Sequence, residues 1–309
     1  MVFKRLLGAL GVGGPTVDTV LDPGAARPGG VLSGQVHLRG GDADFDIEQI
    51  TLELVARVEA EHEGGESEGV VVFDRVHVGG GFRLGPGEER SVPFGLPLPW
   101  ETPVTELHGQ PLGIGLGVRT ELAVAGARDK GDLDPLAVAP LPAQEAVLEA
   151  LGQLGFGFRS ADLEYGRIGG TGQRLPFYQE IELTPAPQYA DRLRQLEVTF
   201  LAAPDGMDVV LEADRRGGLL SSGHDALTLF TVGLDEVRDW TAEVDGWVRQ
   251  LAERGTAHGH GAHHHSGPGM GTAVAAGAAG LAAGVVGGMV AAEVVDEIGD
   301  FFEGDEEEG

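Results

Sequence analysis

The opening third of the chain alternates apolar and polar residues with a period of two, and this pattern constrains the fold more than any other feature. The clearest run interleaves two sets of residues: Leu52, Leu54, Ala56 and Val58 against Glu53, Arg57 and Glu59. Such alternation is typical of antiparallel strands with one buried face and one solvated face. The Pro- and Gly-rich segment 22–30 interrupts the strand pattern as a turn does. The sequence therefore predicts a mainly β protein built from antiparallel β-sandwiches.

Residues 1–140 are predicted to form one N-terminal β-sandwich, because short strand candidates alternate there with glycine-rich turns. Prolines alternate with apolar residues over 92–99, and proline cannot donate to a ladder, so this segment is expected to be an edge strand or to leave the sheet quickly. A break rich in Asp and Pro follows at 126–142. The strands expected are 17–21, 31–39, 47–60, 70–78, 82–84, 91–96, 113–117 and 118–124.

Residues 141–254 are predicted to form a second, smaller β-sandwich with two helices. A connector helix is expected over 143–154, where apolar residues recur at helical spacing after Pro142. A closing helix is expected over 235–254, where Val237, Trp240, Val244, Trp247, Val248 and Leu251 form one stripe. Packing of this stripe on the sandwich is favoured over an exposed partner-binding helix, because so large an apolar stripe does not stay exposed in a monomer. Strand residues expected between the helices are Leu175, Phe177, Gln179, Ile181, Leu183, Leu196, Val198 and Phe200, with the segments 209–213 and 227–232.

The chain is strongly acidic, with a formal net charge of −28. Duplex nucleic acid and anionic membrane surfaces are therefore poor partners, because both bind through clustered Lys and Arg. Basic protein surfaces are the electrostatic complement, although acidity alone also serves solubility. The chain has no cysteine, which excludes disulfides, thiolate metal sites and cysteine nucleophiles, and fits a cytoplasmic location.

No pattern in the sequence predicts catalysis, and we expect no enzyme activity and no bound cofactor. Ser221, Ser222, His224 and Asp225 lack the Gly-x-Ser-x-Gly elbow of a hydrolase. The glycine run 79–81 lacks the Lys-Ser/Thr pair of a phosphate loop. Asp129, Asp132 and Asp134 resemble spaced calcium ligands but lack the closing Glu and the turn glycine, so a solvated turn is favoured.

The segment 255–309 is a low-complexity tail for which several alternatives stay open. Its histidines could bind zinc, nickel or copper, but a His-rich linker without a rigid scaffold is favoured, and no metal-binding residue is assigned: His258, His260, His263, His264 and His265. Residues 269–292 are uncharged and long enough to span a bilayer, with glycines four residues apart at 280, 284 and 288. A disordered, a self-associating and a membrane-inserted segment all remain compatible with them. The acidic end, 293–309, is expected to be solvated or to act as a short docking peptide.

Several segments occur in the order found in a known family: 17–21, 27–34, 40–41, 47–54, 93–97, 102–105 and 127–136. Together they resemble the bacterial sporulation-control proteins, which are relatives of the arrestins. The resemblance covers about residues 1–140 well, and 141–254 more weakly through 175–180 and 196–200. It implies two arrestin-like β-sandwiches, no catalytic residues, and regulation of sporulation or cell development through protein contacts, with a homo-oligomer expected.

The leading hypothesis is a non-enzymatic, cytoplasmic, arrestin-like adaptor that binds other proteins, preferably through their basic surfaces. The alternative is a membrane scaffold of the division or envelope machinery, associated through residues 269–292. A metal-buffering protein is a third hypothesis and depends only on the histidine cluster. The sequence identifies neither the partner nor the surface that binds it.

Overall fold

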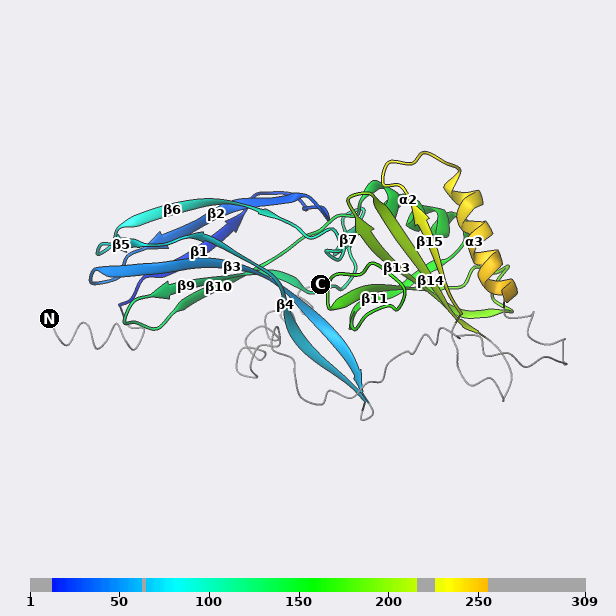
Figure 1. The fold of residues 1–309 in the computed structure, drawn as a ribbon, viewed down its shortest axis with the longest axis horizontal. Coiled ribbons are helices and arrows are strands. Elements are labelled where there is room, and N and C mark those ends of the chain that lie inside the picture. Colours follow the sequence, from blue (N-terminus) through cyan, green and yellow to red (C-terminus); the bar gives the residue numbers. More distant parts are fainter. Residues whose placement is uncertain (1–12, 63–64, 216–225, 255–309) are drawn as a thin grey trace, which may run out of the picture.

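The computed structural model describes residues 13–62, 65–215 and 226–254. In Figure 1 this part of the chain is elongated: β1 to β10 make up the left-hand part, with β7 at its boundary, and β11 to β15 with helices α2 and α3 make up the right-hand part. We refer to these two parts as the first lobe and the second lobe. Strands predominate throughout, so the mainly β fold class predicted from the sequence is confirmed.

The first lobe is a sandwich of two antiparallel layers. One layer has the order β1-β2-β6, and the other contains β10, β9 and β3, with β4 and β5 also paired to β3. The strands are β1 (Thr16–Leu21), β2 (Val31–Arg39), β3 (Phe45–His62), β4 (Gly65–Gly79), β5 (Phe82–Leu84), β6 (Glu89–Pro97), β7 (Glu106–Leu107), β8 (Gln110–Pro111), β9 (Leu116–Val124) and β10 (Lys130–Pro135). Between the layers, alternate residues such as Val36, Leu52 and Leu96 are buried, as the period-two pattern predicts.

Several strand predictions for the first lobe are confirmed and others need correction. The proline-containing strand β6 lies at the edge of its sheet, as expected for residues that cannot donate to a ladder. The segments 113–117 and 118–124 form a single strand that begins only at Leu116. The break predicted over 126–142 is wrong for residues 130–135, because they form β10, which pairs with β9 along its whole length.

The alternation rule fails at Glu53, which is completely buried although it stands on the polar side of the run. It lies on β3, a central strand flanked by β4 and β9. Arg75 of β4 and Arg119 of β9 both bind its carboxylate, and Nε of Arg119 donates to Oε2 at 2.7 Å. A charged side chain can be buried when such partners replace its water, so the polar position is not a solvated one.

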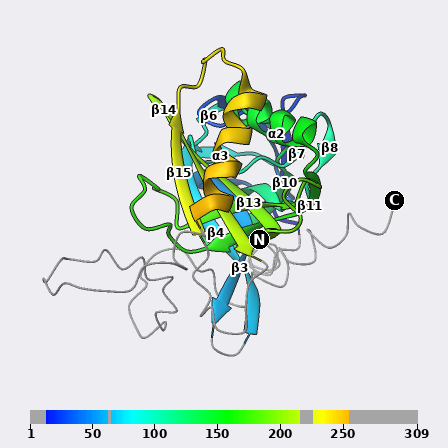
Figure 2. The same ribbon diagram turned by 90° about the vertical axis from the view of Figure 1, so that its right-hand side faces the viewer.

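The second lobe consists of one antiparallel sheet covered by two helices on one face. The strands, in spatial order, are β11 (Gly157–Tyr165), β12 (Phe177–Thr184), β13 (Leu193–Ala203), β14 (Gly206–Arg215) and β15 (Ala226–Val232). The helices α2 (Pro142–Leu154) and α3 (Trp240–Arg254) lie beside each other against this sheet (Figure 2). The expected second sandwich is therefore corrected: the layer opposite the sheet is helical.

The two helices form this layer because each has a continuous apolar stripe. Val147 and Leu151 of α2 and Val244 and Val248 of α3 are at most 1% exposed and share one core with the sheet. The expected packing of the closing helix is confirmed, but this helix begins at Trp240 rather than at 235. The carboxylate of Asp239 accepts a hydrogen bond from the Ala242 N–H at 3.1 Å, which is the geometry of an N-cap.

The two lobes meet at β3 and at the loop that follows β6. One residue pair, Glu59 with Glu164, joins β3 to β11 in parallel. The side-chain amide of Gln179 on β12 accepts from the Val104 N–H at 2.9 Å and donates to the Val104 carbonyl at 2.8 Å. The carboxylate of Glu101 accepts from the backbone N–H of Arg174 and Leu175 at 2.8 Å. These contacts fix the sheet of the second lobe against the first.

Candidate functional site

The face of the second sheet that points away from the helices carries a dense set of carboxylates. Strand alternation places Ile181 and Leu183 in the core under the helices, so their neighbours on β12 face the other side. The adjoining strands follow the same alternation. We call the resulting set the acidic sheet face: Asp162, Glu164, Glu180, Glu182, Glu197 and Glu212.

The strand register sets like charges directly opposite one another. Asp162 is paired with Glu180, and Glu182, Glu197 and Glu212 form one row across three strands. Directly opposed like charges destabilise a sheet, so the arrangement carries an intrinsic cost. All six residues are half-buried, which strengthens the repulsion because less water screens it. From the first lobe, Glu59 on β3 adds a further acid beside Glu164.

The opposed carboxylates change the pKa of Glu180, which lies near the middle of the acidic sheet face. Burial, followed by the charges of Glu197 and Asp162, raises the pKa of the Glu180 carboxyl to about 9. The same causes, burial first and then Glu180 and Glu164, raise the pKa of the neighbouring Tyr178 hydroxyl above its ordinary value. At neutral pH the Glu180 carboxyl therefore holds a proton that a nearby positive charge would displace.

One margin of the acidic sheet face has specific partners. Ser160 Oγ donates to Glu182 Oε2 at 2.7 Å, and Nη1 of Arg159 lies 3.5 Å from the same oxygen. Arg159 is more than half exposed, so this ion pair is screened by solvent. These contacts offset the charge of Glu182 only, and the pKa of Glu180 stays raised.

The structure places two of the motifs singled out in the sequence: the three aspartates near β10 and the glycine run 79–81. Of the three aspartates expected in a solvated turn, Asp129 is exposed in the loop before β10. The prediction is wrong for Asp132 and Asp134, which lie on β10, and Asp132 Oδ2 accepts from the Thr19 N–H at 2.6 Å. Burial, then Asp132 and Asp18, raises the pKa of the Asp134 carboxyl to about 7. The glycine run 79–81 forms the turn between β4 and β5, with positive φ at Gly80 and Gly81.

Other sequence-based hypotheses concern residues outside the described ranges. These are Ser221, Ser222, His224 and Asp225, the histidine cluster 258–265, and the segment 269–292. Neither α2 nor α3 has the length and apolar character that a membrane-spanning helix requires, and no other helix was found in the part of the chain that the structure describes. The proposed tail functions therefore stay predictions.

Two groups of side chains in the described residues bring together donor atoms that could hold a metal ion. One is Asp162, Glu164 and Glu180, within the acidic sheet face. The other is His108, Glu145 and Glu149, at the contact between the lobes. The sequence pattern predicts neither group, because each joins residues of two different elements whose pairing or packing the sequence does not show.

Comparison with known proteins agrees with the fold. A family described as SpoOM protein matches residues 3–217. The curated Sporulation-control protein spo0M of Bacillus subtilis (strain 168) is 37% identical over 215 residues, which cover 69% of this chain and 81% of that protein. The crystal structure of Spo0M, the sporulation control protein from Bacillus subtilis, superposes with a TM-score of 0.66 at 31% identity, covering 79% of this chain and 99% of that one.

Fold and site together define a mainly β protein of two lobes with an acidic face on the second sheet. The family match and the identity to the curated relative are both extensive. The chain belongs to the SpoOM protein family, in agreement with the resemblance seen in its sequence.

Proposed function

We propose that this protein controls sporulation as a non-enzymatic adaptor, and that it binds basic segments of partner proteins on the acidic sheet face. The curated relative and the solved structure are both sporulation-control proteins by name, which supports the first part. The observation that carries the second part is the like-charge register, in which Asp162 opposes Glu180 and three glutamates form a row.

A basic segment is the partner that this face fits best. Lys or Arg side chains placed between the strands would replace repulsion by attraction at half-buried positions, where charge interactions are stronger than on an exposed surface. The net charge of −28 would add long-range attraction of basic partners. An adaptor of this kind needs no reacting group, because recognition is its whole task.

Binding of a cation should be linked to proton release from Glu180. Because its pKa is about 9, Glu180 is largely protonated at pH 7, and a neighbouring positive charge favours the ionised form. Affinity for a basic peptide should therefore increase as the pH rises from 6 to 9. An octalysine titration followed by calorimetry in two buffers of different ionisation enthalpy measures both the affinity and the released proton.

A matched pair of triple variants tests where basic partners bind. Asp162→Asn/Glu164→Gln/Glu180→Gln should weaken octalysine binding about tenfold or more and reduce partner recovery in crosslinked pull-downs from the sporulating host. Glu48→Gln/Glu89→Gln/Glu121→Gln removes the same number of carboxylates from exposed positions of the first lobe. It should change binding only slightly. Equal effects of the two variants would contradict the proposed face and leave only net charge as the attraction.

A further inference from the structure

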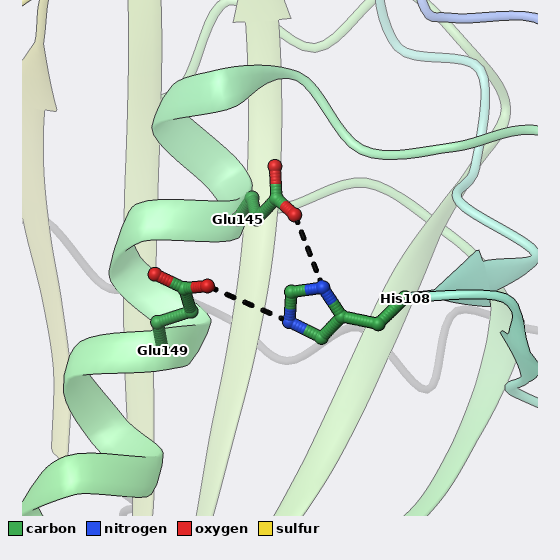
Figure 3. Close-up of side chains that lie close together, drawn as sticks. All are labelled: His108, Glu145 and Glu149. Carbon is green, nitrogen blue, oxygen red and sulfur yellow. Dashed lines mark ion pairs between the residues drawn. The ribbon is translucent and has the colours of Figure 1, made fainter.

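A second cluster, distinct from the acidic sheet face, lies where the β7–β8 hairpin of the first lobe approaches α2 of the second. His108 occupies the turn of this hairpin, and Glu145 and Glu149 stand one helical turn apart on α2 (Figure 3). The His108 ring lies between the two carboxylates: Nδ1 is 3.2 Å from Glu145 Oε1, and Nε2 is 3.6 Å from Glu149 Oε1. One donor atom from each residue lies within 4.8 Å of the others.

The backbone holds the histidine in this position. His108 has a φ of 52°, and it is the only non-glycine residue with a positive φ within the ranges 13–62, 65–215 and 226–254. Gly109 follows with a φ of 74°, and Leu107 pairs with Gln110, so the hairpin closes through two residues of positive φ. This turn is a favoured two-residue connection, and it directs the ring of the first lobe to the helix of the second.

The ring nitrogens of His108 and the carboxylate oxygens that face them are all atoms that a cation can bind. A neutral imidazole has an N–H on one ring nitrogen and a lone pair on the other. Because carboxylate oxygens approach both nitrogens, the lone pair of a neutral ring faces a carboxylate and repels it. A cation held between the ring and the carboxylates removes this repulsion.

We propose that His108, Glu145 and Glu149 form a binding site for a divalent first-row transition metal, with zinc as the representative ion. One neutral imidazole and two carboxylates balance the charge of a divalent cation. Only one ring nitrogen can bind a given ion, and Nδ1 lies 3.2 Å from Glu145 Oε1, close to the separation of about 3.3 Å between ligands of a tetrahedral site with bonds of about 2.0–2.1 Å. Glu149 would turn its carboxylate toward the same ion, and one donor atom from each of the three residues lies within 4.8 Å of the others. Imidazole disfavours calcium and magnesium, which prefer all-oxygen sites.

The side chains are about one third to one half exposed, so water can complete the coordination and the ion can reach the site from solvent. Because the ligands come from two lobes, the bound ion would join the hairpin to α2. Metal binding would then stabilise the contact between the lobes in addition to the Gln179 contact with Val104.

The test must separate this site from the five histidines between 258 and 265, whose side chains could bind the same metals. The parent protein for the experiment is the full chain with His258, His260, His263, His264 and His265 all replaced by Ala. Isothermal titration with Zn²⁺ should show one equivalent bound per chain. His108→Ala and Glu149→Gln should each lower the affinity more than about 100-fold, since losing even a supporting contact of a metal ligand costs about 10–100-fold.

Two substitutions serve as controls on the same parent protein. His37→Ala removes a half-buried histidine of β2, and Glu106→Gln removes a carboxylate of β7 near the hairpin turn. Both should bind zinc as the parent does. Circular dichroism of each variant confirms that it folds, which is expected because the three proposed ligands lie outside the cores.

Two results would overturn the proposal. The first is a parent protein that binds no zinc at concentrations that saturate the full chain with all its histidines intact, which would leave the cluster without a bound ion. The second is a His108→Ala variant that binds zinc as tightly as the parent, which would place the ion elsewhere. Loss of zinc binding in His108→Ala and in Glu149→Gln would support the site, provided that the two control variants bind zinc as the parent does.

Discussion

Glu53 in the first lobe and Glu180 in the second are both glutamates on internal strands, and they have opposite surroundings. Glu53 is fully buried between strands β4 and β9, which supply Arg75 and Arg119 to its carboxylate. Glu180 is half-buried among carboxylates of β11 and β13, and its pKa is raised to about 9. The first lobe compensates its internal charge, whereas the second lobe retains an uncompensated cost at Glu180.

This difference in compensation is the basis for placing the proposed binding on the second sheet. A compensated buried charge fixes one register of strands and contributes nothing to a partner. A row of half-buried acids lowers stability, and proteins retain such local conflicts mainly where they serve binding or chemistry. The comparison therefore favours the second sheet, rather than the first sandwich, as the interaction surface.

The largest effect is expected when the compensated site is broken. Glu53→Ala leaves Arg119, whose side chain is only 12% exposed, without its carboxylate. We expect the free energy of unfolding of the first lobe to fall by about 3–5 kcal/mol. Urea unfolding measures it, with Glu89→Ala at an exposed position of β6 as the control. A loss below 1 kcal/mol would show that the arginines find other partners.

The second prediction concerns Glu180, whose substitution should raise the free energy of unfolding instead of lowering it. The ordinary pKa of the Glu180 carboxyl is 4.5 and its folded pKa is about 9, so between these values the folded chain holds a proton that the unfolded chain has released. The free energy of unfolding should therefore fall as the pH rises through this window. Glu180→Gln should remove the decline and stabilise the protein by about 2 kcal/mol at pH 7.

The control for this substitution is Glu182→Gln, two residues along the same strand on the same face, where Ser160 and Arg159 contact the carboxylate. It should not stabilise the protein and should leave the pH dependence unchanged. Urea unfolding at pH 5, 7 and 9 distinguishes the two variants. A destabilised Glu180→Gln protein would mean that the ionised carboxylate has a structural role.

The hydrogen bonds between Gln179 and Val104 carry no charge, and we expect their loss to have a smaller effect on stability. Gln179→Ala removes both hydrogen bonds to Val104 and should lower the free energy of unfolding by about 1–2 kcal/mol. Hydrogen exchange should increase at the Val104 amide, with little change within either core. Gln195→Ala, on β13 away from the contact between lobes, provides the comparison. Unchanged exchange at Val104 would show that the loop is held by other contacts.

The smallest effect is expected at Asp134, whose pKa of about 7 is raised by burial and by two nearby aspartates. Its folded pKa lies above the ordinary value of 3.8, so stability falls as the pH rises from about 4 to 7. Asp134→Asn should flatten this decline by less than about 1 kcal/mol, because the side chain is partly exposed and screened. Thermal melts at pH 5 and 8 measure it, and Asp129→Asn should show no such gain.

The sequence predicts most strands of the first lobe because each has both an apolar alternation and a turn signal at its end. It fails at Glu53, since alternation alone cannot tell a solvated position from one closed by arginines of two neighbouring strands. It also fails for the layer opposite the second sheet. The helical stripes were recognised, but whether they cover a sheet or lie outside a sandwich depends on tertiary packing.

The candidate site was missed although part of its signal is local. Acids occupy alternate positions at 162 and 164 on β11 and at 180 and 182 on β12, and the polar side of a strand receives little weight in a search for cores. The opposition of these acids depends on strand register, which sequence periodicity does not contain. The group at His108 was harder still, because its members join a hairpin to a helix 37 residues further along the chain.

The core of the first lobe includes Leu163, Leu175 and Phe177, which belong to strands of the second lobe or precede them directly. During synthesis on the ribosome, the first lobe therefore cannot complete its interior until residue 177 has emerged. A fragment that ends at residue 140 should aggregate, whereas one that extends to residue 184 supplies the missing side chains. Helix α2 is synthesised before these residues, so it leaves the ribosome while the core of the first lobe still lacks Leu163, Leu175 and Phe177.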